Sequence, residues 1–154
     1  PPKFSNFESF MVKSRSRFGA QLVPTNLRGV KNLIKALKQN QVSGILPDQD
    51  AGETSGVHAS FFGQPARTMT LASKLIQKTD CAFVFIMMER LPKAQGYCVH
   101  FLPAEQAVAS DDEQLATVAL NRGIEQCIHI APEQYLWSYR RFRKPPVGYQ
   151  NPYK

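Results

Sequence analysis

Apolar residues near the start of the chain recur at the spacing of two amphipathic helices. One helix is expected over residues 4–18, with its basic side chains late, where they suit the helix dipole, and with its end at Gly19. The second begins after Thr25, which can cap it, and is the clearest helix in the chain. Its apolar face consists of Leu27, Val30, Leu33, Ile34 and Leu37.

Short apolar runs in the middle of the chain predict strands, and helical spacing returns once between them. Residues 41–46 indicate a brief buried strand that leads into a loop over residues 47–52, at the end of a strand where sites are usually built. A helix is expected around residues 68–77. Residues 82–88 are apolar on both faces, which is typical of a strand at the centre of a covered sheet. Residues 96–101 predict the next strand, and the short connection between the two indicates a hairpin.

The last third of the chain predicts one long helix and a basic segment. The helix is expected to start at Asp111 and Asp112 and to stop near Pro132. Helices that alternate with strands, together with one hairpin, indicate an α/β fold with a mixed β-sheet flanked by helices. We expect a single domain over residues 1–144, followed by a weakly ordered tail over residues 145–154.

Composition is that of an ordinary globular domain and argues against a disordered or fibrous chain. The chain has 154 residues, of which 43% are hydrophobic and 20% charged. The longest unbroken apolar run, over residues 81–88, is far shorter than the roughly 18–20 residues that cross a bilayer. Because the chain begins Pro1-Pro2-Lys3, with neither an initiator Met nor a leader, we expect it to be a piece of a longer protein.

Charge and cysteine usage narrow the chemistry. The net charge is +7 over residues 1–47, −5 over residues 48–133 and +5 over residues 134–154, so the basic ends predict contact with phosphate, anionic lipid or an acidic protein. The cysteines are odd in number and never in Cys-x-x-Cys spacing, which indicates neither a disulfide framework nor a zinc site and fits a reducing cytoplasm. They are Cys81, Cys98 and Cys127. The usual nucleotide-binding, zinc-protease and serine-hydrolase motifs do not occur.

Three stretches share their order and spacing with a known family. The first is Arg15-Ser16-Arg17-Phe18-Gly19. The second joins Leu46-Pro47-Asp48-Gln49-Asp50 to Phe61-Phe62-Gly63 and to Pro65, Ala66 and Thr68. The third is Ala131-Pro132-Glu133-Gln134-Tyr135-Leu136-Trp137 with Arg140-Arg141-Phe142. In these stretches the chain resembles the C-terminal portion of the lipid A biosynthesis acyltransferases, the late lauroyl and myristoyl transferases of lipopolysaccharide synthesis.

The resemblance implies an activity and a place in the cell. Enzymes of this family move a fatty acyl chain from the thioester of acyl carrier protein to a hydroxyl of the lipid A precursor, at the cytoplasmic face of the inner membrane of Gram-negative bacteria. The resemblance therefore implies acyl carrier protein, the lipid A precursor and the membrane surface as partners of the parent enzyme. It implies no metal, no redox cofactor and no covalent intermediate. It also implies that the fold is the C-terminal part of a glycerolipid-acyltransferase-like fold, and that this portion by itself is soluble.

The family's catalytic dyad, a His-x-x-x-x-Asp/Glu motif whose histidine is the general base, lies in the N-terminal half of its members. We therefore expect no catalytic residue in this chain, and expect the chain alone to be inactive. His100 and Glu105 satisfy the spacing by count, but they follow the Asp-Gln-Asp loop instead of preceding it, and Pro103 lies between them. We interpret that match as chance, and we interpret His58 and His129 as loop and helix-surface residues.

Five residues are implied to support the active site. Asp48, Gln49 and Asp50 match a family block that faces the reacting centre, where a carboxylate could orient an arginine or the acceptor hydroxyl. Arg15 and Arg17 match the preceding block, where a guanidinium suits the phosphates of the lipid or of phosphopantetheine. Which of the two arginines faces the site stays open, because residues two apart on a helix point to different faces.

The basic and aromatic segment near the C-terminus is implied to contact acyl carrier protein or the membrane interface. Its members are Trp137, Arg140, Arg141, Arg143 and Lys144. The aromatic residues at Phe61 and Phe62 are expected to pack in the core or to line the acyl channel. The alternative function is a basic module that binds nucleic acid or an anionic surface, although no nucleic-acid partner is expected. Without its other half, the piece is expected to expose apolar surface and to self-associate.

Overall fold

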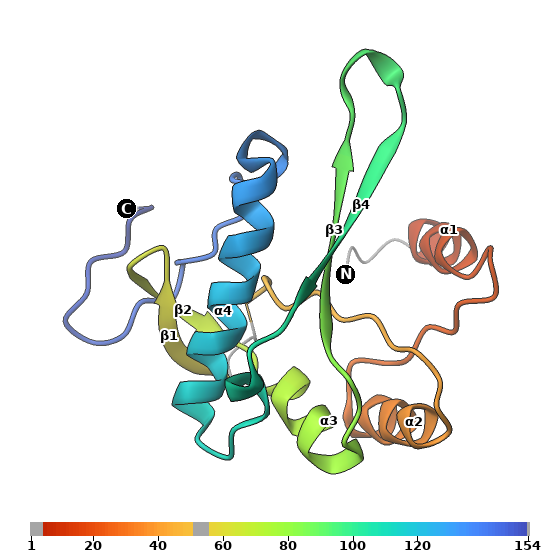
Figure 1. Cartoon of the computed structure of the whole chain (residues 1–154), viewed down its shortest axis with the longest axis horizontal. Coiled ribbons are helices and arrows are strands. Elements are labelled where there is room, and N and C mark those ends of the chain that lie inside the picture. Colours follow the sequence, from red (N-terminus) through yellow and green to blue (C-terminus); the bar gives the residue numbers. More distant parts are fainter. Residues whose placement is uncertain (1–4, 51–55, 154) are drawn as a thin grey trace. The chain divides into compact units, whose positions relative to one another are not determined.

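The structure is a computed structural model that describes residues 5–50 and 56–153 (Figure 1). It divides into two compact units, Pro1–Ser43 and Gly44–Lys154. Part of the predicted loop over residues 47–52 therefore lies outside the described residues. The described part has the mixture of helices and strands that the sequence predicts.

The first unit consists of two helices, α1 (Ser5–Arg15) and α2 (Leu27–Lys38). The predicted continuation of α1 to residue 18 is wrong, because the chain turns after Arg15 and reaches Gly19 in a left-handed conformation with φ of 86°. The predicted cap of α2 at Thr25 is also wrong. Asn26 caps this helix instead, because its Oδ1 accepts hydrogen bonds from the backbone N–H of Arg28 and Gly29.

The buried strand predicted over residues 41–46 does not form. Val42 is 97% exposed and Leu46 is 62% exposed, and no described strand pairs with this segment. An isolated extended segment leaves its backbone groups to water, so a short apolar run alone does not make a strand. The segment runs into the turn at Asp48, from which the second unit continues.

The second unit contains a tight hairpin that the sequence patterns did not predict. Strands β1 (Val57–Phe61) and β2 (Gln64–Thr68) pair antiparallel, with Phe61 opposite Gln64. Phe62 and Gly63 connect them with φ of 48° and 73°, which is the geometry of a two-residue turn whose twist matches paired strands. Phe61, Ala66 and Thr68 are buried, which confirms core packing for this stretch.

The predicted hairpin of the middle region is confirmed. Helix α3 (Leu71–Thr79) precedes it, starting later than predicted because β2 extends to Thr68. Strands β3 (Val84–Arg90) and β4 (Tyr97–Pro103) pair antiparallel around the short 3-10 helix η1 (Pro92–Ala94). The two sheets have two strands each, so the mixed sheet predicted from the sequence is wrong for the described residues.

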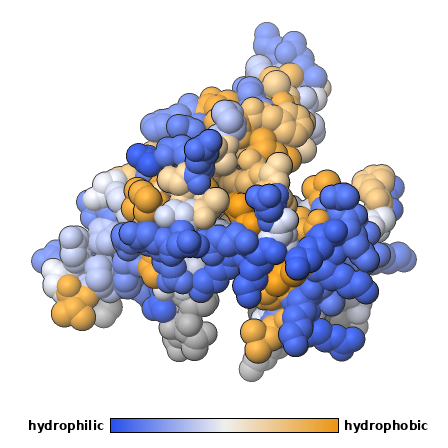
Figure 2. Space-filling view, turned by 60° about the horizontal axis from the view of Figure 1, so that its bottom comes forward, coloured by the Kyte–Doolittle hydropathy of each residue, from blue (hydrophilic) through white to orange (hydrophobic). Residues whose placement is uncertain are grey.

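The hairpin β3–β4 is covered on one face only, so β3 is not the central strand of a covered sheet. Its inner face contains Phe85, which is 6% exposed. Its outer face is apolar and exposed, with side chains of 44% to 67% exposure. This outer face consists of Val84, Ile86, Met88, Tyr97, Val99 and Phe101. In Figure 2, hydrophobic residues at the surface of the molecule are coloured orange. The expected self-association would use surface of this kind and stays a prediction.

Helix α4 (Glu113–Ile130) contacts both hairpins and thereby organises the core of the second unit. It begins at Asp112, whose side chain accepts from the N–H groups of Gln114 and Leu115, and it ends before Pro132, as predicted. A Cβ at Gly123 would lie 2.1 Å from the Phe85 ring, so glycine allows the helix to approach β3 closely. Two 3-10 helices, η2 (Gln106–Ala109) and η3 (Pro132–Gln134), flank α4.

Candidate functional site

The Asp-Gln-Asp turn is tied to the C-terminal basic segment. The Asp50 side chain is 1% exposed, and its Oδ2 accepts a hydrogen bond of 2.6 Å from Arg143 Nε. The backbone N–H of Asp50 donates to the hydroxyl of Tyr139 at 2.8 Å. Asp48 is half-buried and Gln49 is exposed. The ion pair therefore joins the second stretch of the family resemblance to the residue that directly follows the third.

Arg141 is buried, with 3% exposure, and its guanidinium holds the end of β2. Its Nη1 donates to the backbone oxygen of Arg67 at 2.6 Å, and its Nη2 donates to Thr68 Oγ1 at 2.9 Å. Its Cζ lies 5.3 Å from the centre of the Phe61 ring, a cation–π distance. Burial lowers the pKa of Arg141, and the nearby Tyr135, Tyr139, Asp48 and Asp50 oppose that shift.

A network of hydrogen bonds connects Arg141 to helix α4 through Thr68. The Nδ2 of Asn121 donates to Thr68 Oγ1 at 2.9 Å and to the backbone oxygen of Ser60 at 2.8 Å. Thr68 Oγ1 lies 3.1 Å from the Ala66 carbonyl, to which it can donate. Thr68 and Asn121 are fully buried, so these bonds fix β1, β2, α4 and the basic segment against one another.

Tyr135 lies beside the same cluster. Its hydroxyl is buried and lies near Asp48. Burial, with the negative charge of Asp48 as a further cause, raises the pKa of Tyr135 to about 12. The Tyr135 ring packs edge-on against Trp137, with ring centres 4.9 Å apart. We call the group of Asp48, Asp50, Tyr135, Tyr139, Arg141 and Arg143 the aspartate–arginine cluster.

The chemistry available to this cluster is orientation and charge stabilisation. The Asp50 carboxylate and the Arg141 guanidinium are buried, where water competes little for their hydrogen bonds, whereas Arg143 is exposed. The Asp50 carboxylate forms an ion pair with Arg143, and Asp48 is a half-buried carboxylate at the same turn. The arrangement can hold a bound polar group in place, and its side chains include no histidine that could act as a general base near neutral pH.

Gln134 of the third family stretch fastens η3 to β3. Its Oε1 accepts from the backbone N–H of Arg90 at 2.9 Å, and its Nε2 donates to the Arg90 carbonyl at 3.0 Å, so the amide takes the place of a neighbouring strand. The tip of β3–β4 and η3 line an open groove of about 1010 Å³, to which Glu89 and Gln134 contribute.

The predicted contact residues of the basic segment do not form one exposed surface. Arg141 is buried, which contradicts its predicted place on a contact surface, because its guanidinium bonds the end of β2. Arg143 pairs with Asp50. Arg140 is exposed and stacks over Tyr153 at 5.8 Å. Lys144 accepts a hydrogen bond of 2.9 Å from His58 Nε2 through its backbone oxygen when that nitrogen is protonated.

Trp137 and the two N-terminal arginines stay exposed. Trp137 is 56% exposed, and its Nε1 donates to the Pro132 carbonyl at 2.7 Å. Arg15 is the last residue of α1, and Arg17 follows in the turn, with its guanidinium 5.6 Å from the Phe18 ring. Both arginines belong to the first unit, and their contact with phosphate stays a prediction.

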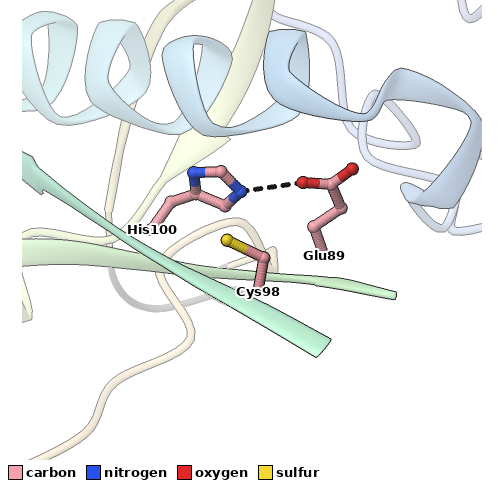
Figure 3. A group of neighbouring side chains, drawn as sticks. All are labelled: Glu89, Cys98 and His100. Atoms are coloured by element: carbon pink, nitrogen blue, oxygen red, sulfur yellow. Dashed lines mark hydrogen bonds and ion pairs between the residues drawn. The ribbon is translucent and has the colours of Figure 1, made fainter. Parts of the chain in front are cut away.

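The histidines pair differently from the counted motif. Glu105 bonds Arg122 at 2.6 Å, whereas His100 Nε2 lies 2.8 Å from Glu89 Oε2 across β3–β4 (Figure 3). His129 packs edge-on against Phe62 at 5.6 Å, which fits a helix-surface residue. Glu89 as the partner of His100 did not follow from the sequence, because the two residues belong to different strands.

The buried polar pair of Asn121 and Thr68 is a second feature that the sequence analysis missed. The one available signal was an asparagine directly after Leu120 and three residues before Ile124, on the apolar face predicted for the long helix.

Comparison with known proteins identifies the family. The sequence profile described as bacterial lipid A biosynthesis acyltransferase matches residues 1–144. The chain is 35% identical over 127 residues to the lipid A biosynthesis lauroyltransferase of Escherichia coli K12, covering 82% of this chain and 42% of that protein. It is 30% identical over 138 residues to the palmitoleoyltransferase of the same strain, covering 89% of this chain and 45% of that protein. The chain belongs to the bacterial lipid A biosynthesis acyltransferase family, which confirms the resemblance.

The matches cover most of this chain but less of its relatives. The chain spans less than half the length of these two relatives. The myristoyltransferase of Escherichia coli K12 matches in the same way, with 25% identity over 140 residues, 91% of this chain and 43% of that protein. Within the described residues, no helix has the length and apolar character that crossing a membrane requires.

Proposed function

We propose that this chain is the C-terminal portion of an enzyme that transfers a fatty acyl chain to a hydroxyl of the lipid A precursor. The single observation that carries the proposal is the family match over residues 1–144, with relatives named for lauroyl, palmitoleoyl and myristoyl transfer to lipid A.

The donor in this proposal is the acyl thioester of acyl carrier protein, and the acceptor hydroxyl attacks the thioester carbonyl directly. The thiolate of the carrier then leaves, and the acceptor proton passes to a base. The proposed step needs neither a metal nor a redox cofactor. Among the predicted docking residues, exposed Arg140 fits an acidic carrier best, since Arg141 is buried. Arg140→Glu in the parent enzyme should raise the apparent KM for the acyl donor, and an unchanged KM would argue against docking there.

The aspartate–arginine cluster supports the reaction by positioning. The Asp50–Arg143 pair fixes the turn, so that Asp48 meets the substrate from a constrained backbone. A charge-assisted hydrogen bond from such a carboxylate to the acceptor is worth on the order of 1.5–3 kcal/mol. Arg15 and Arg17 are proposed to bind phosphate of the lipid or of phosphopantetheine, as the family stretch implies.

The portion alone is proposed to be inactive. The His-x-x-x-x-Asp/Glu motif of the family does not occur at its family position before the Asp-Gln-Asp turn. The parent would act at the cytoplasmic face of the inner membrane, where its lipid substrate is held. Two observations weigh against the nucleic-acid alternative: Arg141 is buried, and Arg143 is paired with Asp50, so the aromatic and basic segment offers fewer cations than its sequence suggests.

A domain exchange tests the activity. Residues 1–144 would replace the matching stretch of the Escherichia coli lauroyltransferase, in cells that lack that enzyme, and lipid A would be analysed by mass spectrometry. We expect the added acyl mass to return, and to be lost in the Asp48→Ala version at equal protein level. An exchanged protein that accumulates normally and leaves lipid A unacylated would overturn the proposal.

The unfused chain tests the second part of the proposal. The 154-residue chain, shown by circular dichroism to be folded, would be incubated with acyl carrier protein thioester and lipid A precursor. We expect no acylated product. Product formation would show that the missing motif is dispensable, and would direct the search for the base to the His100–Glu89 pair.

A further inference from the structure

A thiol, an imidazole and a carboxylate converge on one face of the β3–β4 hairpin (Figure 3). In the strand register, Glu89 lies directly opposite Cys98, and His100 follows Cys98 by two residues on the same strand. Directly opposed residues, and residues two apart, project from the same face of a sheet. The three side chains therefore share the inner face of the hairpin, which also holds Phe85.

The three donor atoms are already close to one another. His100 Nε2 lies 2.8 Å from Glu89 Oε2, and one ligand atom from each of Glu89, Cys98 and His100 lies within 4.8 Å of the others. All three residues are half-buried, and Cys98 is not in a disulfide. Tetrahedral zinc, with bonds of about 2.0–2.3 Å, holds its ligand atoms about 3.3–3.8 Å apart. Side-chain shifts of about 1 Å would bring the set to that spacing.

The ligand types and their charges select the ion. Thiolate and imidazole favour Zn²⁺ over Mg²⁺ or Ca²⁺, which prefer oxygen ligands. One thiolate and one carboxylate supply two negative charges, so the site with a bound divalent ion would have no net charge. A group without net charge has a small desolvation cost at a half-buried position. Glu89 also lines the open groove beside η3, which gives an ion and a water molecule a path to the site.

We propose that Glu89, Cys98 and His100 form a binding site for a zinc-type divalent cation, with water as the fourth ligand. Binding replaces the proton of the Cys98 thiol with the metal and replaces the His100–Glu89 hydrogen bond with two bonds to the ion. Each bound ion therefore releases at least one proton to solvent. The site would clamp β3 to β4 near the turn at the tip of the hairpin. The inference is independent of the proposed acyl transfer.

The test is a metal titration of the whole, reduced, metal-free chain with Zn²⁺ alone and with Co²⁺ as a spectroscopic probe. We expect one ion per chain, a dissociation constant for Zn²⁺ below about 1 μM, and a thiolate-to-cobalt charge-transfer band in the near ultraviolet. Cys98→Ser should abolish that band, and Glu89→Gln and His100→Gln should each weaken binding at least about tenfold. Cys81→Ser is the matched control, because Cys81 is also half-buried and precedes the same hairpin, and it should leave the titration unchanged.

The outcomes separate a metal site from a simple ion pair. Circular dichroism of each variant without metal must match the parent chain, since a misfolded variant would also lose the band. If Cys98→Ser fails to fold, the rate at which Cys98 of the parent chain is alkylated can be measured with and without Zn²⁺. Protection of Cys98 by Zn²⁺ would support the site, and an unchanged rate would argue against it. No stoichiometric binding, or a cobalt spectrum that lacks the thiolate band or survives Cys98→Ser, would leave only a His100–Glu89 ion pair and overturn the proposal.

Discussion

Replacing Arg141 with alanine should destabilise the second unit more than any exposed arginine change does. The substitution removes two hydrogen bonds from a guanidinium that is 3% exposed, to the Arg67 carbonyl and to Thr68 Oγ1. It also removes the cation–π contact with Phe61 and leaves a cavity beside that ring. Because Thr68 and Phe61 are fully buried and Phe61 belongs to the hydrophobic core, the loss falls on the core of the unit.

The magnitude follows from opposing contributions. Two hydrogen bonds from a charged donor contribute about 1.5–3 kcal/mol each, and the ring contact about 1 kcal/mol. Removal of the charge relieves its desolvation cost, which is reflected in the lowered pKa of Arg141 and in its buried Nε, which has no hydrogen-bond partner in the part of the chain that the structure describes. The net loss should be about 3 kcal/mol, at the lower end of values for breaking buried charged networks. A domain stable by about 5–15 kcal/mol would stay folded at room temperature.

Urea unfolding followed by tryptophan fluorescence measures this loss, because Trp137 is the one tryptophan and lies in the second unit. With a slope of about 2 kcal/mol per molar urea, the midpoint should fall by about 1.5 M. Arg140→Ala is the control, since Arg140 is exposed, and should change stability by less than about 0.5 kcal/mol. A loss for Arg141→Ala of the same small size as the control would refute the structural role of the buried guanidinium.

Three further changes test other parts of the second unit. Asp50→Asn should cost about 1–3 kcal/mol of unfolding free energy in urea, because it breaks the ion pair between a buried carboxylate and Arg143; a midpoint equal to wild type would argue against that pair. Gly123→Ala should cost about 1–3 kcal/mol in thermal unfolding, because the new Cβ would lie 2.1 Å from the Phe85 ring; unchanged stability would mean that the helix does not approach β3 so closely. Tyr135 should titrate near pH 12 in ultraviolet absorbance, and since the unfolded phenol loses its proton near pH 10, its stabilisation should be present below pH 10 and lost as pH rises through 12. Titration of every tyrosine near pH 10 in the folded chain would contradict that burial.

Local patterns predicted those elements whose partners are near in sequence. The hairpin β3–β4 and the long helix α4 followed from apolar spacing, a short connection and an acidic cap, all of which are local signals. The strand expected over residues 41–46 failed because a strand needs a neighbour, and a short apolar run does not specify one. The hairpin β1–β2 was missed because a Phe-Gly pair is a weak turn signal beside Asn-Gly.

The candidate site was predictable as a set of residues and not as an arrangement. Family spacing selected Asp50, Arg141 and Arg143, but assigned the carboxylate to the active site and both arginines to a contact surface. The structure pairs Asp50 with Arg143 and buries Arg141 against β2. Arg141 and Arg143 have different environments although they are two residues apart, because the chain turns between them, with the Arg143 N–H 3.3 Å from the Arg140 carbonyl. Composition alone would place both arginines on the solvent-exposed surface.

The zinc-type site illustrates the same limit through strand register. Cysteine spacing along the chain indicated no metal site, because the ligands come from two strands and only Cys98 and His100 are close in sequence. Glu89 joins them through the connection at the tip, where Leu91 N–H bonds the Gly96 carbonyl at 2.9 Å and sets the pairing. A shift of one residue in that pairing would turn Glu89 to the opposite face from His100. Whether the three donors meet is therefore decided by the geometry of the turn, which is encoded in residues that carry no ligand atom themselves.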